Sequence, residues 1–309
     1  MKIKVVFMLI FCLIMTSCAE VKNNFAEQSV VIENDGYSLN GVYSYIDDGG
    51  EYPAVLIIAG SGPIDYDGTA GVLRPYKDIA DGLVQNGISI LRVDKRTFEY
   101  AADFDVRAGI EEEYLSDCRA AVKFLKERGT SEIYLLGHSL GGQIAAEIAA
   151  EDSEIDGVIL FNSSARHLAD IACDQFIAID PDNSAEYITY AQAAKNASEG
   201  NAKGYYYYSA SDWYWVSYNK LDTIKSITDA DIKTLIINST ADMQSFDADI
   251  KMWQDNFSDS EKVTIRIYDD MSHIGYKIDM TDHTSIFAEA GFPDELISVF
   301  SDFINFGNG

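Results

Sequence analysis

The chain has 309 residues, of which 47% are hydrophobic, and a formal net charge of −27 from 50 acidic and 23 basic side chains. This length accommodates one α/β domain with an insertion or two small domains, and the apolar fraction supports a sizeable buried core. The negative charge argues against nucleic acid as a partner, because phosphate binding needs clustered Lys and Arg, and equally against electrostatic docking on anionic lipid.

The N-terminus has the pattern of an export signal. A short basic start precedes an unbroken apolar run at 5–15, which is shorter than the about 20 residues that span a bilayer but suits a signal-peptide core. Small residues lead from this run to Cys18, and the segment resembles the lipobox of bacterial lipoproteins, in which the cysteine is lipidated. We expect a lipoprotein signal peptide at 1–17, a lipid anchor on Cys18 that holds the exported protein at a membrane, and a polar tether at 18–27. An ordinary cleaved signal with a coincidental cysteine is the alternative.

From residue 28 onward, strand-like runs alternate with helix-like runs, which is typical of a mostly parallel sheet covered by helices on both faces. The predicted elements of the first half are, in chain order, a strand pair at 28–46, a strand at 54–59, a helix at 76–85, a strand at 88–93, a helix at 111–128, a strand at 132–136, a helix at 141–150 and a strand at 157–161.

The alternation breaks at 167–230, which is rich in Ala and aromatic residues and shows no clear strand. It then resumes with a strand at 234–238, a helix at 246–257, a strand at 262–268 and a helix at 293–306. We therefore expect one α/β domain at 28–309 with a helical cap insertion at about 167–230.

A candidate nucleophile lies in the run Gly137-His-Ser-Leu-Gly141, a G-x-S-x-G pattern between a predicted strand and a predicted helix. The sharp turn at such a serine brings neighbouring backbone so close that small residues are needed two positions before and after it. Ser139 is therefore the predicted nucleophile, and an inert serine in a glycine-rich turn is the alternative. The backbone amides of Leu140 and of Ser61, in the glycine-rich loop after the strand at 54–59, are the predicted oxyanion donors.

A serine nucleophile needs a base held by an acid, and in this strand–turn–helix context the order along the chain is Ser, Asp or Glu, then His. Of the four histidines, His273 follows the last predicted strand, where a loop can reach the carboxyl edge of the sheet. His273 is the predicted base, with His283 as the rival. His138 lies inside the G-x-S-x-G turn at 137–141, which we call the elbow, and His167 lies at the start of the insertion.

The acid is expected after the preceding strand, on the same edge. Asp242 lies four residues past the apolar run that ends at Asn238 and is the predicted acid. Asp247 is the nearest rival, but its place at the start of a predicted helix favours a capping or solvated role. Asp269 and Asp270 are too close to the predicted base in sequence to orient it easily.

No cofactor or metal ion is predicted, because the chain has no C-x-x-C pair and no metal-ligand spacing. Cys118 and Cys173 are the cysteines that would remain after processing at Cys18. Cys118 falls in an apolar helical pattern and is expected to be a small core residue. A bridge between the two can form in an oxidising compartment, but no feature of the sequence supports one.

Four segments together resemble a known family, and they are 54–68 (AVLIIAGSGPIDYDG), 76–80 (YKDIA), 91–96 (LRVDKR) and 137–142 (GHSLGG). In that order they resemble bacterial α/β-hydrolases of the serine aminopeptidase-like and dienelactone-hydrolase-like esterase group. The resemblance covers residues 50–305 and implies the α/β-hydrolase fold, with a mostly parallel eight-stranded sheet, and hydrolysis of an acyl bond through an acyl-enzyme. The chain departs from this group at Tyr66, Thr97 and Asn238, which leaves the substrate undetermined by analogy.

The working substrate is a small molecule, an uncharged carboxylic ester of modest size, because a strongly acidic enzyme repels anionic substrates. Aromatic residues of the insertion, including 205–208 and 213–215, can line its pocket or simply pack the cap onto the core. A serine aminopeptidase or amidase is the second reading, with Asp65 and Asp67 holding the substrate amine unless they serve only the turn. The third is a catalytically silent surface lipoprotein that binds ligands on the same scaffold. The oligomeric state is not indicated.

Overall fold

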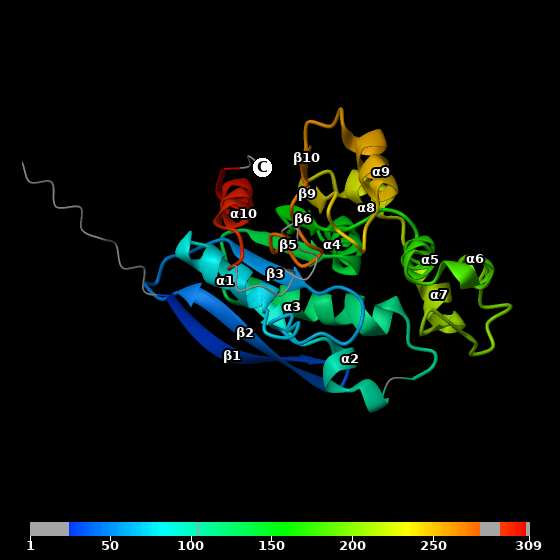
Figure 1. Cartoon of the computed structure of the whole chain (residues 1–309). Helices are drawn as coiled ribbons and strands as arrows, with labels where there is room; N and C mark the ends of the chain where they lie inside the picture. The colour runs from blue at the N-terminus through cyan, green and yellow to red at the C-terminus, as the bar shows by residue number, and fades with distance from the viewer. Residues whose placement is uncertain (1–24, 104, 279–290, 307–309) are drawn as a thin grey trace, which may run out of the picture.

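The computed structural model describes residues 25–103, 105–278 and 291–306, and its centre is an eight-stranded sheet (Figure 1). The strand order is β1-β2-β4-β3-β5-β6-β9-β10. Strand β2 is antiparallel to both β1 and β4, and every other neighbouring pair is parallel. The strands are β1 (Phe25–Asn34), β2 (Tyr37–Ile46), β3 (Ala54–Ile58), β4 (Ser89–Val93), β5 (Ile133–His138), β6 (Gly157–Phe161), β9 (Lys233–Ser239) and β10 (Val263–Tyr268). The expected mostly parallel sheet is confirmed.

Helices cover both faces of this sheet. Helices α1 and α10 contribute to the core on one face, and α3, α4, α8 and α9 contribute to the core on the other. The central strands β3, β5 and β6 are buried along their whole length, as their continuous apolar runs predict. The helices are α1 (Pro75–Gln85), α2 (Arg96–Glu99), α3 (Ser116–Glu127), α4 (Leu140–Glu151), α5 (Leu168–Ile179), α6 (Ser184–Lys195), α7 (Asp212–Tyr218), α8 (Thr223–Ala230), α9 (Asp247–Phe257) and α10 (Asp294–Phe306).

Strand β1 begins inside the segment that the sequence predicts to be a tether, so the 18–27 boundary needs correction. From Phe25 onward the chain pairs with β2. The Glu27 carboxylate accepts a hydrogen bond from Ser44 Oγ (3.1 Å) and forms an ion pair with Arg92 (3.0 Å). These partners lie far along the chain, which is why the polar local pattern does not predict a strand.

The helix predicted at 111–128 is divided in two. Its first residues, Glu111–Leu115, form a π-helical turn, and α3 begins only after it. Neighbouring side chains on an α-helix diverge by about 100°, whereas here the consecutive residues Glu113 and Tyr114 both contact Lys95. Isolated π-helical turns occur often at functional sites.

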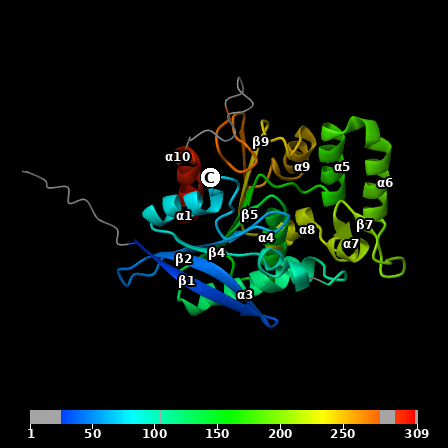
Figure 2. The same cartoon turned by 60° about the horizontal axis from the view of Figure 1, so that its bottom comes forward.

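The insertion forms a cap that lies to one side of the sheet, with α5, α6 and α7 grouped together (Figures 1 and 2). It also contains a short hairpin, β7 (Tyr206–Tyr207) and β8 (Ala210–Ser211), where the sequence shows no clear strand. The last helix of the insertion, α8, packs on α4, and Ser226 Oγ donates to the Glu147 carboxylate (2.7 Å). The cap proper therefore comprises α5, α6, α7 and the hairpin.

Three expectations concern the ends and the cysteines. The predicted signal peptide at 1–17 and lipidation site Cys18 lie outside the described residues. Within the ranges described, no helix combines the length and the hydrophobicity needed to cross a bilayer. Cys118 and Cys173 are both free thiols, so no bridge joins them.

Candidate active site

Ser139 lies at the tight turn between the central strand β5 and helix α4. Its backbone has a φ of +55° and a ψ of −125°. Residues other than glycine rarely adopt this backbone conformation. Close packing maintains this turn. A Cβ at position 137 would overlap the carbonyl of Gly141, and one at position 141 would overlap the carbonyl of Ile58. The two glycines of the predicted elbow are therefore required by backbone contact.

The predicted acid and base contact each other directly. His273 Nδ1 lies 2.7 Å from Asp242 Oδ2, and the Asp242 side chain is fully buried. The carboxylate also accepts hydrogen bonds from Ser245 Oγ (2.6 Å) and from the amide of Gln244 (2.7 Å). Burial alone would raise the pKa of Asp242, but the imidazole and these donors outweigh it and the pKa is lowered. Asp242 is therefore ionised and orients the ring through Nδ1.

Ser139 and His273 line the same small cavity, which has a volume of about 50 Å³. Among the described residues no hydrogen bond joins the Ser139 hydroxyl to the imidazole, although the Nδ1 side of that ring is bound. Catalytic hydrogen bonds are often long in the absence of substrate and tighten in the substrate complex. The structure thus places Ser139, the predicted nucleophile, at the same cavity as His273, which is bound to Asp242.

The rival residues occupy other places. Asp247 is exposed in the first turn of α9. Asp270 forms an ion pair with Lys277 (3.3 Å), and Asp269 is exposed. His167 caps α5 by accepting from the amide of Ala169 (3.1 Å). The other rival base, the histidine at 283, lies outside the described residues.

The elbow histidine connects the nucleophile turn to the loop of the predicted base. His138 Nε2 lies 2.9 Å from the His273 carbonyl, which can only accept, so Nε2 carries the proton of the neutral ring. His138 Nδ1 therefore accepts from Tyr76 Oη (2.9 Å), which in turn accepts from the Gly60 amide (3.3 Å). Asn162 Nδ2 donates to the same carbonyl (2.8 Å). Burial lowers the pKa of His138 to about 3, so its ring is neutral.

Sequence reasoning missed three residues of this network. Tyr76 and His138 stand inside segments that were singled out for other reasons, and Asn162 directly follows strand β6. Asn162 also has a positive φ of 44°. A polar side chain at the carboxyl end of a buried strand is the signal that could have found it, because that edge carries the site.

The two predicted oxyanion donors border the same cavity as Ser139. Gly60 packs against Ser139, since a Cβ at position 60 would lie 3.1 Å from Ser139 Cβ. Within the described part of the chain, the amides of Ser61 and Leu140 donate to no protein acceptor. Leu140 is the first residue of α4, where the helix dipole favours negative charge. Both amides are therefore available to a substrate oxygen.

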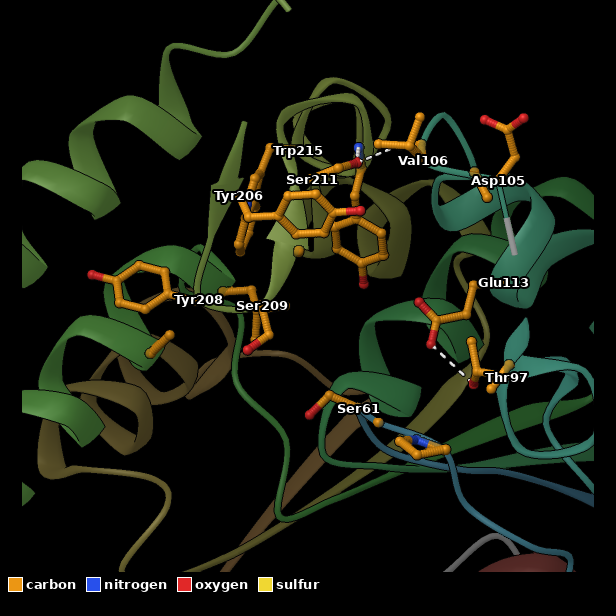
Figure 3. Close-up of a pocket in the computed structure, with 18 of the residues that line it drawn as sticks. Ser61, Thr97, Asp105, Val106, Glu113, Tyr206, Tyr208, Ser209, Ser211 and Trp215 are labelled. Atoms are coloured by element: carbon orange, nitrogen blue, oxygen red, sulfur yellow. Dashed lines mark hydrogen bonds between the residues drawn. The ribbon is translucent and has the colours of Figure 1, made fainter. Parts of the chain in front are cut away.

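A much larger cavity, of about 620 Å³, lies between the cap and the segment that follows β4. It shares Ser61, Leu168 and Gln175 with the small cavity at Ser139. Figure 3 shows Tyr206 and Tyr208 of the cap on one side of it, and Thr97 and Glu113 on the other. Its lining is mostly apolar and aromatic, and includes Ala101, Val106, Ala108, Leu168, Ala172, Phe176, Tyr206, Tyr208, Ala210, Tyr214 and Trp215.

The two carboxylates predicted to hold a substrate amine are engaged elsewhere. Asp65 accepts from the amide (2.7 Å) and the hydroxyl (2.6 Å) of Thr69, which is turn chemistry. Asp67 pairs with Arg92, and Arg74 lies 3.8 Å from it. Neither aspartate lines the two cavities at Ser61. The described residues also contain no cluster of His, Cys, Asp and Glu suited to a metal ion.

A known family and a known protein resemble this chain. Residues 66–178 match a family model described as serine aminopeptidase, S33. Esterase EstD of Thermotoga maritima is 32% identical over 256 residues, which cover 81% of this chain and 60% of that protein. This chain thus spans less than two thirds of the length of the curated relative that it matches.

Solved structures show the fold. Est1E of Butyrivibrio proteoclasticus superimposes with a TM-score of 0.58 at 15% identity, and the match covers 88% of this chain and 96% of Est1E. The acylaminoacyl peptidase of Pyrococcus horikoshii gives a TM-score of 0.62 at 17% identity, over 92% of this chain and 41% of the peptidase. The chain therefore has the α/β-hydrolase fold that its sequence motifs imply.

Proposed function

We propose that this chain is a serine hydrolase that cleaves carboxylic esters through an acyl-enzyme on Ser139. The observation that carries the proposal is the buried Asp242–His273 pair (2.7 Å), which shares a cavity with a serine on a positive-φ turn and with two free amides. Similarity to an esterase over 256 residues supports it. Hydrolysis is then acyl transfer from an alcohol to Ser139 and from Ser139 to water.

Each step uses a group described above. His273 Nε2 takes the proton of the Ser139 hydroxyl as its oxygen attacks the ester carbonyl, and Asp242 stabilises the resulting imidazolium. The amides of Ser61 and Leu140 donate to the oxyanion of the tetrahedral intermediate. Its collapse breaks the ester C–O bond, and the imidazolium protonates the departing alcohol. A water molecule then repeats the sequence on the acyl-enzyme, which releases the acid and restores the Ser139 hydroxyl.

An ester fits the site better than an N-terminal amine. Asp65 and Asp67, the carboxylates that could hold an amine, bind Thr69 and the arginines instead. Two carboxylates line the large cavity: Glu113 forms an ion pair with Lys95 (2.7 Å), and the exposed Asp105 accepts a hydrogen bond from the amide of Arg107 (2.7 Å). Since the charge of Glu113 is compensated and most of the lining is apolar or aromatic, we infer that the large cavity takes an uncharged, apolar or aromatic part of the ester.

Attachment to a membrane is a separate part of the proposal. The short apolar run at 5–15 and the small residues before Cys18 support an exported lipoprotein anchored through that cysteine. The strongly acidic composition gives no electrostatic reason for membrane binding. The lipid would therefore be the attachment.

The first experiment is labelling of the mature protein with a fluorophosphonate probe, which bonds to activated serines. We expect labelling of the wild type and loss of labelling and of ester hydrolysis in Ser139→Ala. Ser298→Ala is the matched control, because this exposed serine on α10 donates only to a carbonyl of its own helix. Absence of labelling in the folded wild type, or equal labelling of Ser139→Ala, would contradict the proposal.

The second experiment separates an esterase from an aminopeptidase. p-Nitrophenyl esters of increasing acyl length are compared with aminoacyl-anilides on the same preparation. We expect turnover of the esters, because their leaving group is good and the two carboxylates predicted to hold an amine, Asp65 and Asp67, bind Thr69 and Arg92 instead. Turnover of the anilides alone would show that the chain is a serine aminopeptidase or amidase instead.

A further inference from the structure

Lys95 lies two residues beyond strand β4, and only 7% of its surface is exposed. Its Nζ atom donates to the carbonyl oxygens of Gly62 (2.7 Å) and Gly60 (3.1 Å). It also contacts the Glu113 carboxylate (2.7 Å) and the Tyr114 hydroxyl (2.6 Å). The ammonium group, with three N–H bonds, is therefore fully engaged, and two of its four partners are backbone carbonyls of the oxyanion loop.

The contact with Gly60 determines where the amide of Ser61 points. The Gly60 carbonyl and the Ser61 N–H belong to one peptide unit, and in a planar trans peptide these two bonds point in opposite directions. A carbonyl directed at the buried ammonium therefore directs the Ser61 N–H away from it. Ser61 borders both cavities next to the nucleophile, whereas Lys95 borders neither.

The same carbonyl is bound a second time. Tyr114 Oη donates to the Gly60 oxygen (2.6 Å) while it accepts from the Lys95 ammonium. The π-helical turn at 111–115 supplies this hydroxyl and the Glu113 carboxylate from adjacent positions. Glu113 compensates the buried positive charge, and the ammonium also lies over the Tyr114 ring, 4.0 Å from its centre.

An ion pair formed only for stability would not need this arrangement. Buried ion pairs add little net stability, because desolvation offsets the attraction between the charges. A paired cation that in addition binds the carbonyls on both sides of Ser61 restricts the rotation of that loop. An oxyanion donor must be oriented before the charge develops, since reorientation during the reaction costs free energy.

We propose that Lys95 is a positioning residue of the oxyanion hole, which holds the loop 60–62 so that the Ser61 amide faces the developing oxyanion. The inference rests on the proposed ester hydrolysis and adds to it a group that touches neither substrate nor the reacting atoms. It acts on the transition state and leaves ground-state binding of the ester nearly unchanged.

The test compares Lys95→Met with Arg96→Met, a matched loss of a neighbouring buried cation. Arg96 is 4% exposed and pairs with Asp117 (3.0 Å to Nε), away from the loop. For Lys95→Met we expect kcat to fall about 10- to 100-fold with KM within about twofold. The inhibition constant of a trifluoromethyl ketone, which forms a tetrahedral anion on the serine, should rise by the same factor.

Arg96→Met should lose stability without these kinetic changes, each variant being assayed where circular dichroism shows it folded. If Lys95→Met does not fold, Tyr114→Phe decides, because it removes one hydroxyl with little change in volume. We expect it to lower kcat and weaken the ketone about 3- to 10-fold in parallel. If the wild type is active and the folded variant has the same kcat and the same ketone affinity, this inference is wrong, while the proposed ester hydrolysis stands. A folded wild type without serine labelling overturns the proposed function together with it.

Discussion

At the scale of single residues, the predicted site depends on three side chains that are far apart in the sequence. Ser139 follows β5, Asp242 follows β9 and His273 follows β10, and the parallel arrangement of these strands brings all three to one edge of the sheet. Asp242 is completely buried and receives hydrogen bonds from the base and from its own loop. The role of acid should therefore belong to Asp242 alone.

We predict that Asp242→Asn lowers kcat by about four orders of magnitude, because an amide does not hold the imidazole in the required tautomer. Asp247→Asn should stay within about twofold of the wild type, since this exposed carboxylate contacts no group of the site. Steady-state kinetics on one p-nitrophenyl ester measure both. A larger loss in Asp247→Asn than in Asp242→Asn would reassign the acid.

The sequence patterns point to Ser139, Asp242 and His273 through their local context, and the structure places these three residues at one edge of the sheet. The strand–turn–helix around Ser139, and the loops after two apolar runs, are visible without coordinates. Lys95, His138 and Asn162 were not predicted, because each binds backbone carbonyls of loops distant in sequence. A side chain that recognises a carbonyl leaves no complementary residue in the sequence to be matched with it.

At the scale of elements, the buried strands were the most predictable part. Runs such as 54–59 and 157–161 are apolar without interruption because both faces of those strands are covered. The start of β1 and the π-helical turn at 111–115 were not predicted, since cross-strand pairing and the contacts of Lys95 determine them. The hairpin of the cap has positive φ at Tyr208 and Ser209. The sequence does not predict this turn, because neither residue type favours positive φ.

The cap cavity leads to a prediction at this scale. Ala172 on α5 lines the cavity, so Ala172→Phe should fill part of it. For esters with a bulky acyl group we expect kcat/KM to fall at least about tenfold, while an acetate ester stays within about twofold, because a short acyl group does not reach this space.

The matched control for this change is Ala185→Phe, at an exposed position on the neighbouring helix α6. It adds the same side chain to the cap without entering the cavity, so it should leave both ester classes unaffected. Equal losses on bulky and acetate esters in Ala172→Phe would mean that the substitution disturbs the cap as a whole and that the cavity does not bind the acyl group.

At the scale of the whole molecule, the net charge of −27 makes the chain self-repelling and unsuited to anionic surfaces. Electrostatic attraction to the membrane therefore cannot hold the protein there if the lipid anchor is absent. Anionic lipid headgroups would repel the folded domain, and a polar segment would have to keep the domain at a distance from them. If the protein is found at a membrane, the attachment must be covalent or hydrophobic.

We accordingly predict that the full chain, expressed in a bacterial host, fractionates with membranes and stays there in high salt. Cys18→Ala should release it into the soluble fraction, because the site of lipidation is removed. Cys12→Ala, inside the apolar run, is the control and should not change the distribution. Membrane association of Cys18→Ala equal to that of the wild type would contradict the anchor.

The hydrogen bond from His138 to the His273 carbonyl affects how accurately the loop of His273 is placed relative to the turn at Ser139. Strands β5 and β10 lie three strand spacings apart in the sheet order, or about 14 Å at the usual spacing. Without this hydrogen bond, small changes in the twist and spacing of β6 and β9 would add up to a displacement between β5 and β10. The loop after β10 brings His273 back across this gap, and the imidazole of His138 binds the His273 carbonyl (2.9 Å), so one hydrogen bond joins the turn at Ser139 directly to that loop.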